Sequence, residues 1–271
     1  MGSLRTRVAL TICIGVASCM LGRAAVAGNF EVSPIRLDFD AGTRSSVLTI
    51  RNDSAEDTVV IQAKVFKWTQ QDGRELTTPT TDLIVNPPIF TLKSGALQIV
   101  RVGPRASALT ESNRTELSYR IVLAEVPKQP SAEFRGVGVA LSLSIPIFFP
   151  PKETADQPLP AIDASRDADG RVIASVNNTG TRSFKVIKVT LTDSATQQPL
   201  DEVAQVRYLL ANSKFSWTFR PPLPAPANFT VSVLSDRGVH SIDVKERRID
   251  AAANTAATSN TSPSSTTTSP Q

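Results

Sequence analysis

Short stretches of alternating apolar and polar residues follow one another along the first half of the chain. Turn signals such as Asn52-Asp53-Ser54 and Gln71-Asp72-Gly73 separate them. No window of a dozen residues has a clean helical period. Seven short strands at this spacing predict an immunoglobulin-like β-sandwich. The predicted strands are residues 30–39, 46–51, 59–68, 81–85, 97–102, 117–126 and 134–149.

The second half repeats this organisation after a proline-rich segment. Residues 150–160 contain four prolines and several charged residues, which is typical of a domain linker. A second series of β patterns follows at residues 161–249, where Asp169-Gly170 predicts a hairpin turn rather than a calcium loop, because the later calcium ligands are missing. The prediction is therefore an all-β protein with two immunoglobulin-like domains, residues 28–149 and 161–249. Residues 250–271 are almost entirely Ala, Asn, Thr, Ser and Pro, and predict a disordered Ser/Thr-rich tail.

The first 27 residues have a different pattern. Two arginines precede an uncharged, mostly apolar run at residues 8–22, and a small-x-small site ends at Ala27. This order predicts a secretory signal peptide cleaved after Ala27, since the run is too short to span a membrane. An alternative is a lipobox at residues 16–19, which would leave Cys19 lipidated.

The composition looks different once residues 1–27 are removed. The net charge of the whole chain, +4, falls to +1, because three arginines and no acidic residue lie in the signal peptide. Both cysteines, Cys13 and Cys19, are also there, so the remaining chain has no thiol for disulfides, catalysis or Cys-ligated zinc. A nearly neutral charge does not favour a nucleic-acid partner.

The sequence contains no convincing catalytic or metal-binding pattern. The single histidine, His240, lies on a predicted strand, and no nucleophile elbow, phosphate loop or dinucleotide fingerprint is present. We therefore predict a protein with no catalytic residues, no metal, no cofactor and no small-molecule substrate.

The predicted strand at residues 134–149 is unusually long. Its bulky side chains alternate with small residues and Pro146, which gives one bulky face and one small face. The bulky residues are Val137, Val139, Leu141, Leu143, Ile145 and Ile147. At about 3.4 Å per residue the strand would span roughly 50 Å. It either packs in its own domain core, with an extended loop before it, or it is an edge strand that offers its side chains to a partner by β-augmentation.

Four stretches in order resemble the PapD-like periplasmic pilus chaperones of the chaperone–usher pathway. Together they cover about residues 30–249, and no single one is specific. They are Val32-Ser33-Pro34-Ile35-Arg36, residues 86–92 with 98–102, the strand 119–127 ending in Glu125-Val126-Pro127, and residues 144–150.

The resemblance implies a boomerang of two immunoglobulin-like domains in the periplasm, with pilin subunits and an outer-membrane usher as partners. It also implies a donor strand that completes the fold of a pilin, with Val137, Val139, Leu141 and Leu143 as donated residues and Ile145 as a further candidate. Arg36 matches the first basic residue that anchors the pilin's C-terminal carboxylate in the family.

One position departs from the family pattern. The second anchor is normally a lysine, and Pro146 stands at its place, which resembles the archaic branch of these chaperones. Arg120 is the candidate replacement, because it alternates against an apolar face and a half-buried Arg usually pairs with a carboxylate. The alternatives are a solvated edge residue for Arg36 and a structural ion pair for Arg120. For the whole protein, the alternative to a chaperone is an exported structural or adhesive immunoglobulin-like protein.

Overall fold

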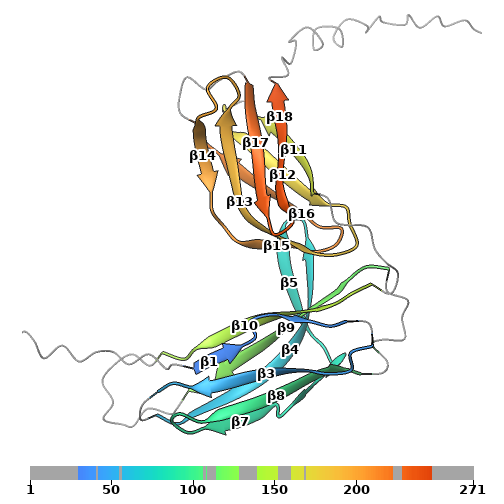
Figure 1. Ribbon diagram of the computed structural model, residues 1–271, viewed down its shortest axis with the longest axis vertical. Helices are drawn as coiled ribbons and strands as arrows, with labels where there is room; N and C mark the ends of the chain where they lie inside the picture. The colour runs from blue at the N-terminus through green and yellow to red at the C-terminus, as the bar shows by residue number, and fades with distance from the viewer. Residues whose placement is uncertain are drawn as a thin grey trace, which may run out of the picture. The chain divides into compact units, whose positions relative to one another are not determined.

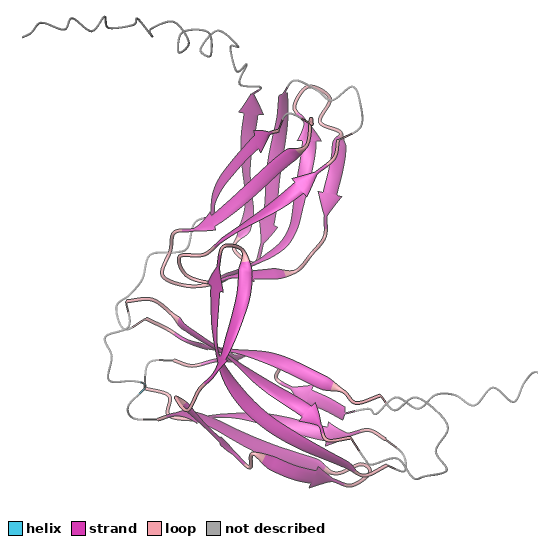
Figure 2. Ribbon diagram, turned by 180° about the vertical axis from the view of Figure 1, so that it is seen from behind, coloured by secondary structure: helices cyan, strands magenta, loops and turns pink. Residues whose placement is uncertain are grey.

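The computed structural model describes residues 30–40, 42–54, 57–105, 108, 114–127, 139–151, 160–167, 169–221 and 228–245. The chain divides into two compact units. The first comprises Met1–Thr69 and Glu75–Thr154, and the second comprises Gln70–Arg74 and Ala155–Gln271. Strands dominate both units, and no described residue lies in an α-helix (Figure 2). The described part of the chain is therefore all-β, as the alternation pattern predicted.

Two sheets form the first unit, and most of their strands are labelled in Figure 1. The four-stranded sheet has the order β1-β3-β8-β6, and the six-stranded sheet has the order β2-β10-β9-β4-β5 with β7 also paired to β4. The strands are β1 (Phe30–Ser33), β2 (Leu37–Asp38), β3 (Ser46–Asn52), β4 (Val59–Gln71), β5 (Arg74–Pro79), β6 (Leu83–Asn86), β7 (Ile89–Leu92), β8 (Leu97–Pro104), β9 (Leu117–Glu125) and β10 (Ser142–Phe149).

The inner faces of both sheets share one apolar core. Leu48, Ile61, Val100, Ile121 and Ile147 are each 0% exposed within it. Alternate residues of a strand point to opposite faces of its sheet, so the period-2 pattern supplies this core directly. The first unit is an immunoglobulin-like β-sandwich, which confirms the predicted fold class for this part of the chain.

The predicted strand at residues 30–39 is wrong as one element. It divides into β1, which pairs with β3 in the four-stranded sheet, and β2, which pairs in parallel with β10 in the other sheet. Pro34 lies between them, and a proline has no N–H to continue a ladder. The buried positions also change phase across the crossing, from Phe30 and Val32 before it to Leu37 and Phe39 after it.

The predicted strand at residues 134–149 is wrong in its length. Strand β10 begins at Ser142, and residues 139–141 are described without strand structure. Its neighbour explains the start, because Ser142 pairs with Ala124 and β9 ends at the next residue, Glu125. Alternation marks which side chains share a face, but the length of a strand also depends on how far a neighbour runs beside it.

The second unit is also a two-sheet sandwich. Its sheets have the orders β11-β12-β16 and β14-β13-β17-β18, and β15 also pairs with β13. Val176, Phe184, Leu191, Phe219 and Val231 are fully buried in its separate core. The strands are β11 (Pro160–Arg166), β12 (Val172–Asn178), β13 (Phe184–Asp193), β14 (Pro199–Val203), β15 (Arg207–Leu209), β16 (Lys214–Phe219), β17 (Asn228–Ser235) and β18 (Gly238–Lys245).

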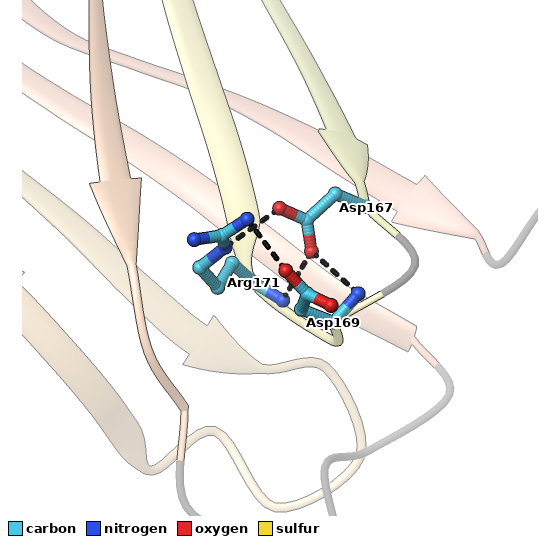
Figure 3. Close-up of polar contacts among 3 residues, drawn as sticks. All are labelled: Asp167, Asp169 and Arg171. Carbon is cyan, nitrogen blue, oxygen red and sulfur yellow. Dashed lines mark hydrogen bonds and ion pairs between the residues drawn. The ribbon is translucent and has the colours of Figure 1, made fainter.

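The predicted hairpin turn around Asp169-Gly170 is confirmed. Strands β11 and β12 pair from Arg166 opposite Val172, and Gly170 has a positive φ of 78° that favours glycine. The Asp167 carboxylate accepts hydrogen bonds from the backbone N–H of Asp169, at 3.0 Å, and from both the backbone N–H and the Nε of Arg171 (Figure 3). These hydrogen bonds stabilise the turn.

Several predictions fall on residues that the structure does not describe. The signal peptide with Cys19, residue Val137 and the tail at residues 250–271 lie outside the described residues. In the described part, no helix is long and apolar enough to cross a membrane. The same part of the chain holds no cluster of three or more His, Cys, Asp or Glu that could bind a metal.

Candidate functional site

The outward face of the six-stranded sheet carries an unusual set of bulky and charged side chains. Residues that share a face alternate along each strand, and the inward positions of β9 and β10 are in the core. The outward positions include Arg120 on β9, Pro146 and Phe148 on β10, and Trp68 on β4. Trp68 and Phe148 are 1% and 2% exposed although they lie outside the sandwich core.

Arg36 lies just before β2, beside β10. Its Nε and Nη2 donate two hydrogen bonds to Asp38, each 2.7 Å long, in a bidentate ion pair. Its Cζ lies 4.4 Å from the centroid of the Phe148 ring, which is a cation–π distance. Arg36 is therefore held by a ring beneath it and a carboxylate beside it, and its side chain is 30% exposed.

Arg120 is held in the same way from β9. Its Nη2 donates to Glu75 on β5 at 3.0 Å, and its Cζ lies 3.8 Å from the centroid of the Trp68 ring. The Cα register places Arg120 directly opposite Pro146 on β10. The position that carries the second anchor lysine in the family resemblance is thus the immediate cross-strand neighbour of Arg120.

The two aromatic rings connect the two arginines. The ring centroids of Trp68 and Phe148 are 6.0 Å apart, within the usual range for an aromatic pair. Arg36 stacks on one ring and Arg120 on the other, so both guanidinium groups lie over one aromatic surface. Rings cover the faces of the guanidinium planes, whereas carboxylates bind at their edges. This arrangement suits recognition of an anionic group such as a carboxylate.

Burial along the chain leading into β10 changes steadily. Val139 is 70% exposed, Leu141 and Leu143 are half-buried against the edge of the core, and Ile145 and Ile147 are 4% and 0% exposed within it. At the exposed end, the backbone N–H of Leu141 donates to the Glu125 side chain at 3.2 Å. The bulky side chains therefore pack in the domain's own core from Ile145 onward, and they become progressively more exposed in the direction of Val139.

Within the described ranges, one edge of β10 has no strand beside it over most of its length. Strand β9 pairs with all of β10, but β2 reaches only Ile147 and Phe148 on the other side. Pro146 fits this arrangement, since a proline within a sheet is tolerated on an edge strand. Among the described residues, positions 142–146 thus offer an unpaired edge next to the half-buried Leu141 and Leu143.

Sequence reasoning identified the arginines but missed the residues that hold them. Asp38, Glu75, Trp68 and Phe148 were not predicted to belong to the site. A signal existed for Phe148, which is bulky at a position where the preceding face has only small residues and proline. Glu75 had no such signal, because β5 is exposed along its whole length and was not predicted as a strand.

The comparisons with known proteins agree with this fold. Residues 29–155 match the family described as Pili and flagellar-assembly chaperone, PapD N-terminal domain. The chaperone protein LpfB of Salmonella typhimurium is 24% identical over 147 residues, which are 54% of this chain and 60% of LpfB. The chain thus matches less than two thirds of the length of this curated relative.

Solved structures extend the likeness of the fold across both units. A chain in the CsuC–CsuE chaperone–tip adhesion subunit complex, from the archaic chaperone–usher Csu pili of Acinetobacter baumannii, matches with a TM-score of 0.58 at 18% identity. This match covers 79% of the present chain and 97% of the other. The YadV chaperone gives a TM-score of 0.57 at 15% identity, with 80% and 98% covered. The Salmonella enterica SafA pilin–SafB chaperone complex gives 0.54 at 15%, with 82% and 98% covered.

The fold therefore defines an all-β protein of two immunoglobulin-like sandwiches, of the kind found in two-domain chaperones. The family match covers residues 29–155, just under half of the chain, and for this part it confirms the resemblance to the PapD-like pilus chaperones drawn from the sequence. Assignment to the archaic branch and the roles of individual site residues stay predictions.

Proposed function

We propose that this protein is a periplasmic chaperone that binds pilin subunits by donor-strand complementation and delivers them to an outer-membrane usher. Its work is binding, so it needs no cofactor, metal, nucleic acid or small-molecule substrate and has no enzymatic activity. The observation that carries the proposal is the unpaired edge of β10, with its graded burial, beside two arginines on a shared aromatic surface.

The donor segment would use alternate side chains from Val137 to Leu143. A pilin lacking its last strand would pair with the free edge through main-chain hydrogen bonds, and the apolar side chains would fill its groove. Ile145 is already buried in the chaperone's own core, so it would mark the boundary of the donor segment. Burial of each donated Val or Leu would contribute about 1.5–3 kcal/mol.

Arg36 and Arg120 would anchor the subunit's C-terminal carboxylate. Charge-assisted, bidentate hydrogen bonds between arginine and carboxylate have a fixed geometry, so the anchor would also set the register of the bound strand. The directly opposed positions of Arg120 and Pro146 support Arg120 as the second anchor in place of the usual lysine.

The donor segment can be tested by changing Val139 and Leu141 together to Asp and measuring co-purification with the cognate pilin. Charges on the donated face would be buried unpaired in the pilin groove, so capture should be lost. Val239→Asp, on β18, is the matched control: Val239 is 65% exposed, similar to Val139, and capture should survive. Intact capture by the double variant would contradict donor-strand binding.

The anchor can be tested separately with Arg36→Ala. The variant should fold normally and lose capture of the subunit, because the carboxylate would lose one of its two arginine partners. Arg51→Ala is the control, since Arg51 also pairs with acidic residues, Glu31 and Asp53, but on the other sheet. If Arg36→Ala captured pilin as well as the control does, Arg36 would not be an anchor.

One observation favours the second candidate, an exported structural or adhesive protein. Ile145, Ile147 and Phe149 of β10 lie in the core of their own domain, as a purely structural strand would require. The two candidate functions predict different binding by the variant in which Val139 and Leu141 are both changed to Asp. A structural protein would keep all of its binding, and a chaperone would lose its pilin.

A further inference from the structure

Each of the two anchor arginines already has a carboxylate partner within its own chain. Asp38 accepts two hydrogen bonds from Arg36, both at 2.7 Å, through the Nε–Nη2 edge, which is one of the two edges that a bidentate ligand can use. Glu75 takes the Nη2 of Arg120 at 3.0 Å. The site thus contains two positive and two negative side chains and has no net charge from these four groups.

The acidic partners are more exposed than the arginines. The side chains of Arg36 and Arg120 are 30% and 19% exposed, whereas those of Asp38 and Glu75 are 55% and 37% exposed. Aromatic rings fix the arginines from below. Asp38 and Glu75 lie on β2 and β5, at opposite ends of the strand order of the sheet. Either acid could turn outward into water while its arginine stays on its ring.

We propose that Asp38 and Glu75 are internal competitors that occupy the anchor arginines in the subunit-free chaperone and lower its affinity for a C-terminal carboxylate. This inference rests on the proposed function of Arg36 and Arg120 as the carboxylate anchor. A third carboxylate entering the site leaves a net negative charge while both acids are present. The incoming carboxylate therefore competes with both acids for the two arginines, which weakens capture and favours later release.

Neutral substitutions test the competition. The variants are Asp38→Asn, Glu75→Gln and the double variant of the full-length exported protein. The probe is a fluorescein-labelled peptide of alternating valine and threonine with a free C-terminal carboxylate, and its affinity is measured by fluorescence anisotropy. The same peptide with a C-terminal amide reports binding that does not use the carboxylate.

Each single variant should bind the carboxylate peptide about two- to fivefold more tightly than the wild type, the range of one exposed ion pair, and the double variant should bind more tightly still. Affinity for the amide peptide should not change. Asp53→Asn and Glu202→Gln are matched controls, because they make the same change of charge at the ion pairs with Arg51 and Lys188. They should leave both affinities unchanged.

Two other results would overturn the inference in distinguishable ways. If the acid variants bound the carboxylate peptide equally or more weakly while the wild type still preferred carboxylate to amide, Asp38 and Glu75 would orient the arginines and not compete. In that case the anchor itself would stand. If the wild type bound the two peptides equally, the anchor would fail, and the competition would fail with it.

Discussion

At the scale of single residues, two buried asparagines stabilise corresponding places in the two sandwiches. Asn52 ends β3 and Asn178 ends β12, and both are 0% exposed. In each case the side-chain oxygen accepts a hydrogen bond from the backbone N–H two residues later, at 3.0 Å. The side-chain NH2 then donates to backbone carbonyls of a strand or loop more than 30 residues further along the chain.

Asn178→Ala should therefore destabilise the second unit strongly. The substitution removes the side-chain NH2 that donates to the carbonyls of Arg182, Leu209 and Leu210, and the acceptor of the Gly180 N–H. Urea denaturation should show a loss of about 2–4 kcal/mol. The neighbouring half-buried Asn177 provides the control, and Asn177→Ala should change stability by less than about 1 kcal/mol. Similar losses of stability for the two variants would mean that the buried hydrogen bonds of Asn178 do not explain its effect.

Asp167 makes the stability of the second unit depend on pH in the acid range. Desolvation by surrounding atoms raises the pKa of Asp167, but hydrogen bonds from the side chain and backbone of Arg171 and its positive charge outweigh this, so the pKa lies below the ordinary 3.8. A carboxyl with a lowered pKa stabilises the fold fully above its unfolded pKa. The contribution disappears as the pH falls through the lower, folded value.

Asp167→Asn should therefore be less stable than the wild type at neutral pH, and the difference should shrink as the pH falls below about 4. Thermal unfolding of both proteins across this pH range measures the difference, and NMR titration of the carboxyl measures the pKa directly. The exposed Asp169 is a useful comparison, because its carboxylate accepts a hydrogen bond from Nη2 of Arg171 (Figure 3). If the stability difference between wild type and variant increased as the pH fell, this explanation would be contradicted.

At the scale of secondary-structure elements, β10 and the residues before it divide into a structural part and an exposed part. The side chains of Ile147, Leu143 and Val139 share one face, but they pass from fully buried through half-buried to 70% exposed. The same alternating pattern thus contributes unequally to the stability of the free protein.

Truncation along this face should give a matching gradient of stability. Ile147→Ala should cost about 3–4 kcal/mol, because it leaves a cavity in the core. Leu143→Ala should cost about 1–2 kcal/mol and Val139→Ala less than about 0.5 kcal/mol. Chemical denaturation of the subunit-free protein measures all three. A Val139→Ala loss as large as that of Ile147→Ala would place Val139 in the domain's own core.

At the scale of the whole molecule, the predicted cleavage of the signal peptide would decide which reactive groups the mature protein has. Cleavage after Ala27 would remove both cysteines and three arginines and leave a nearly neutral chain without thiols. The alternative, cleavage before Cys19, would leave one lipidated cysteine at the new N-terminus.

We expect intact mass and N-terminal sequencing of the exported protein to give Gly28 as its first residue. Its unfolding midpoint should then be the same with and without a reducing agent, because no thiol remains. Metabolic labelling with palmitate should leave it unlabelled. A labelled protein beginning at Cys19 would establish the lipoprotein alternative.

The sequence by itself determined the class of fold and much of the site. Period-2 alternation and turn residues predict two β-sandwiches because burial on one face of a strand is a local property. Arg36 and Arg120 were identified from the family resemblance and, for Arg120, from alternation. Two predictions were wrong: a single strand at residues 30–39, and the length of the strand at 134–149. Both features depend on which strands pair with each other.

Only the tertiary structure decided how the site is assembled. Asp38, Glu75, Trp68 and Phe148 come from four different strands, and no spacing in the sequence relates them. Pairing between strands brings them together, with Arg120 opposite Pro146 and the two rings 6.0 Å apart. Register and contact between strands are long-range properties, because a given alternation is compatible with several pairings until the chain packs.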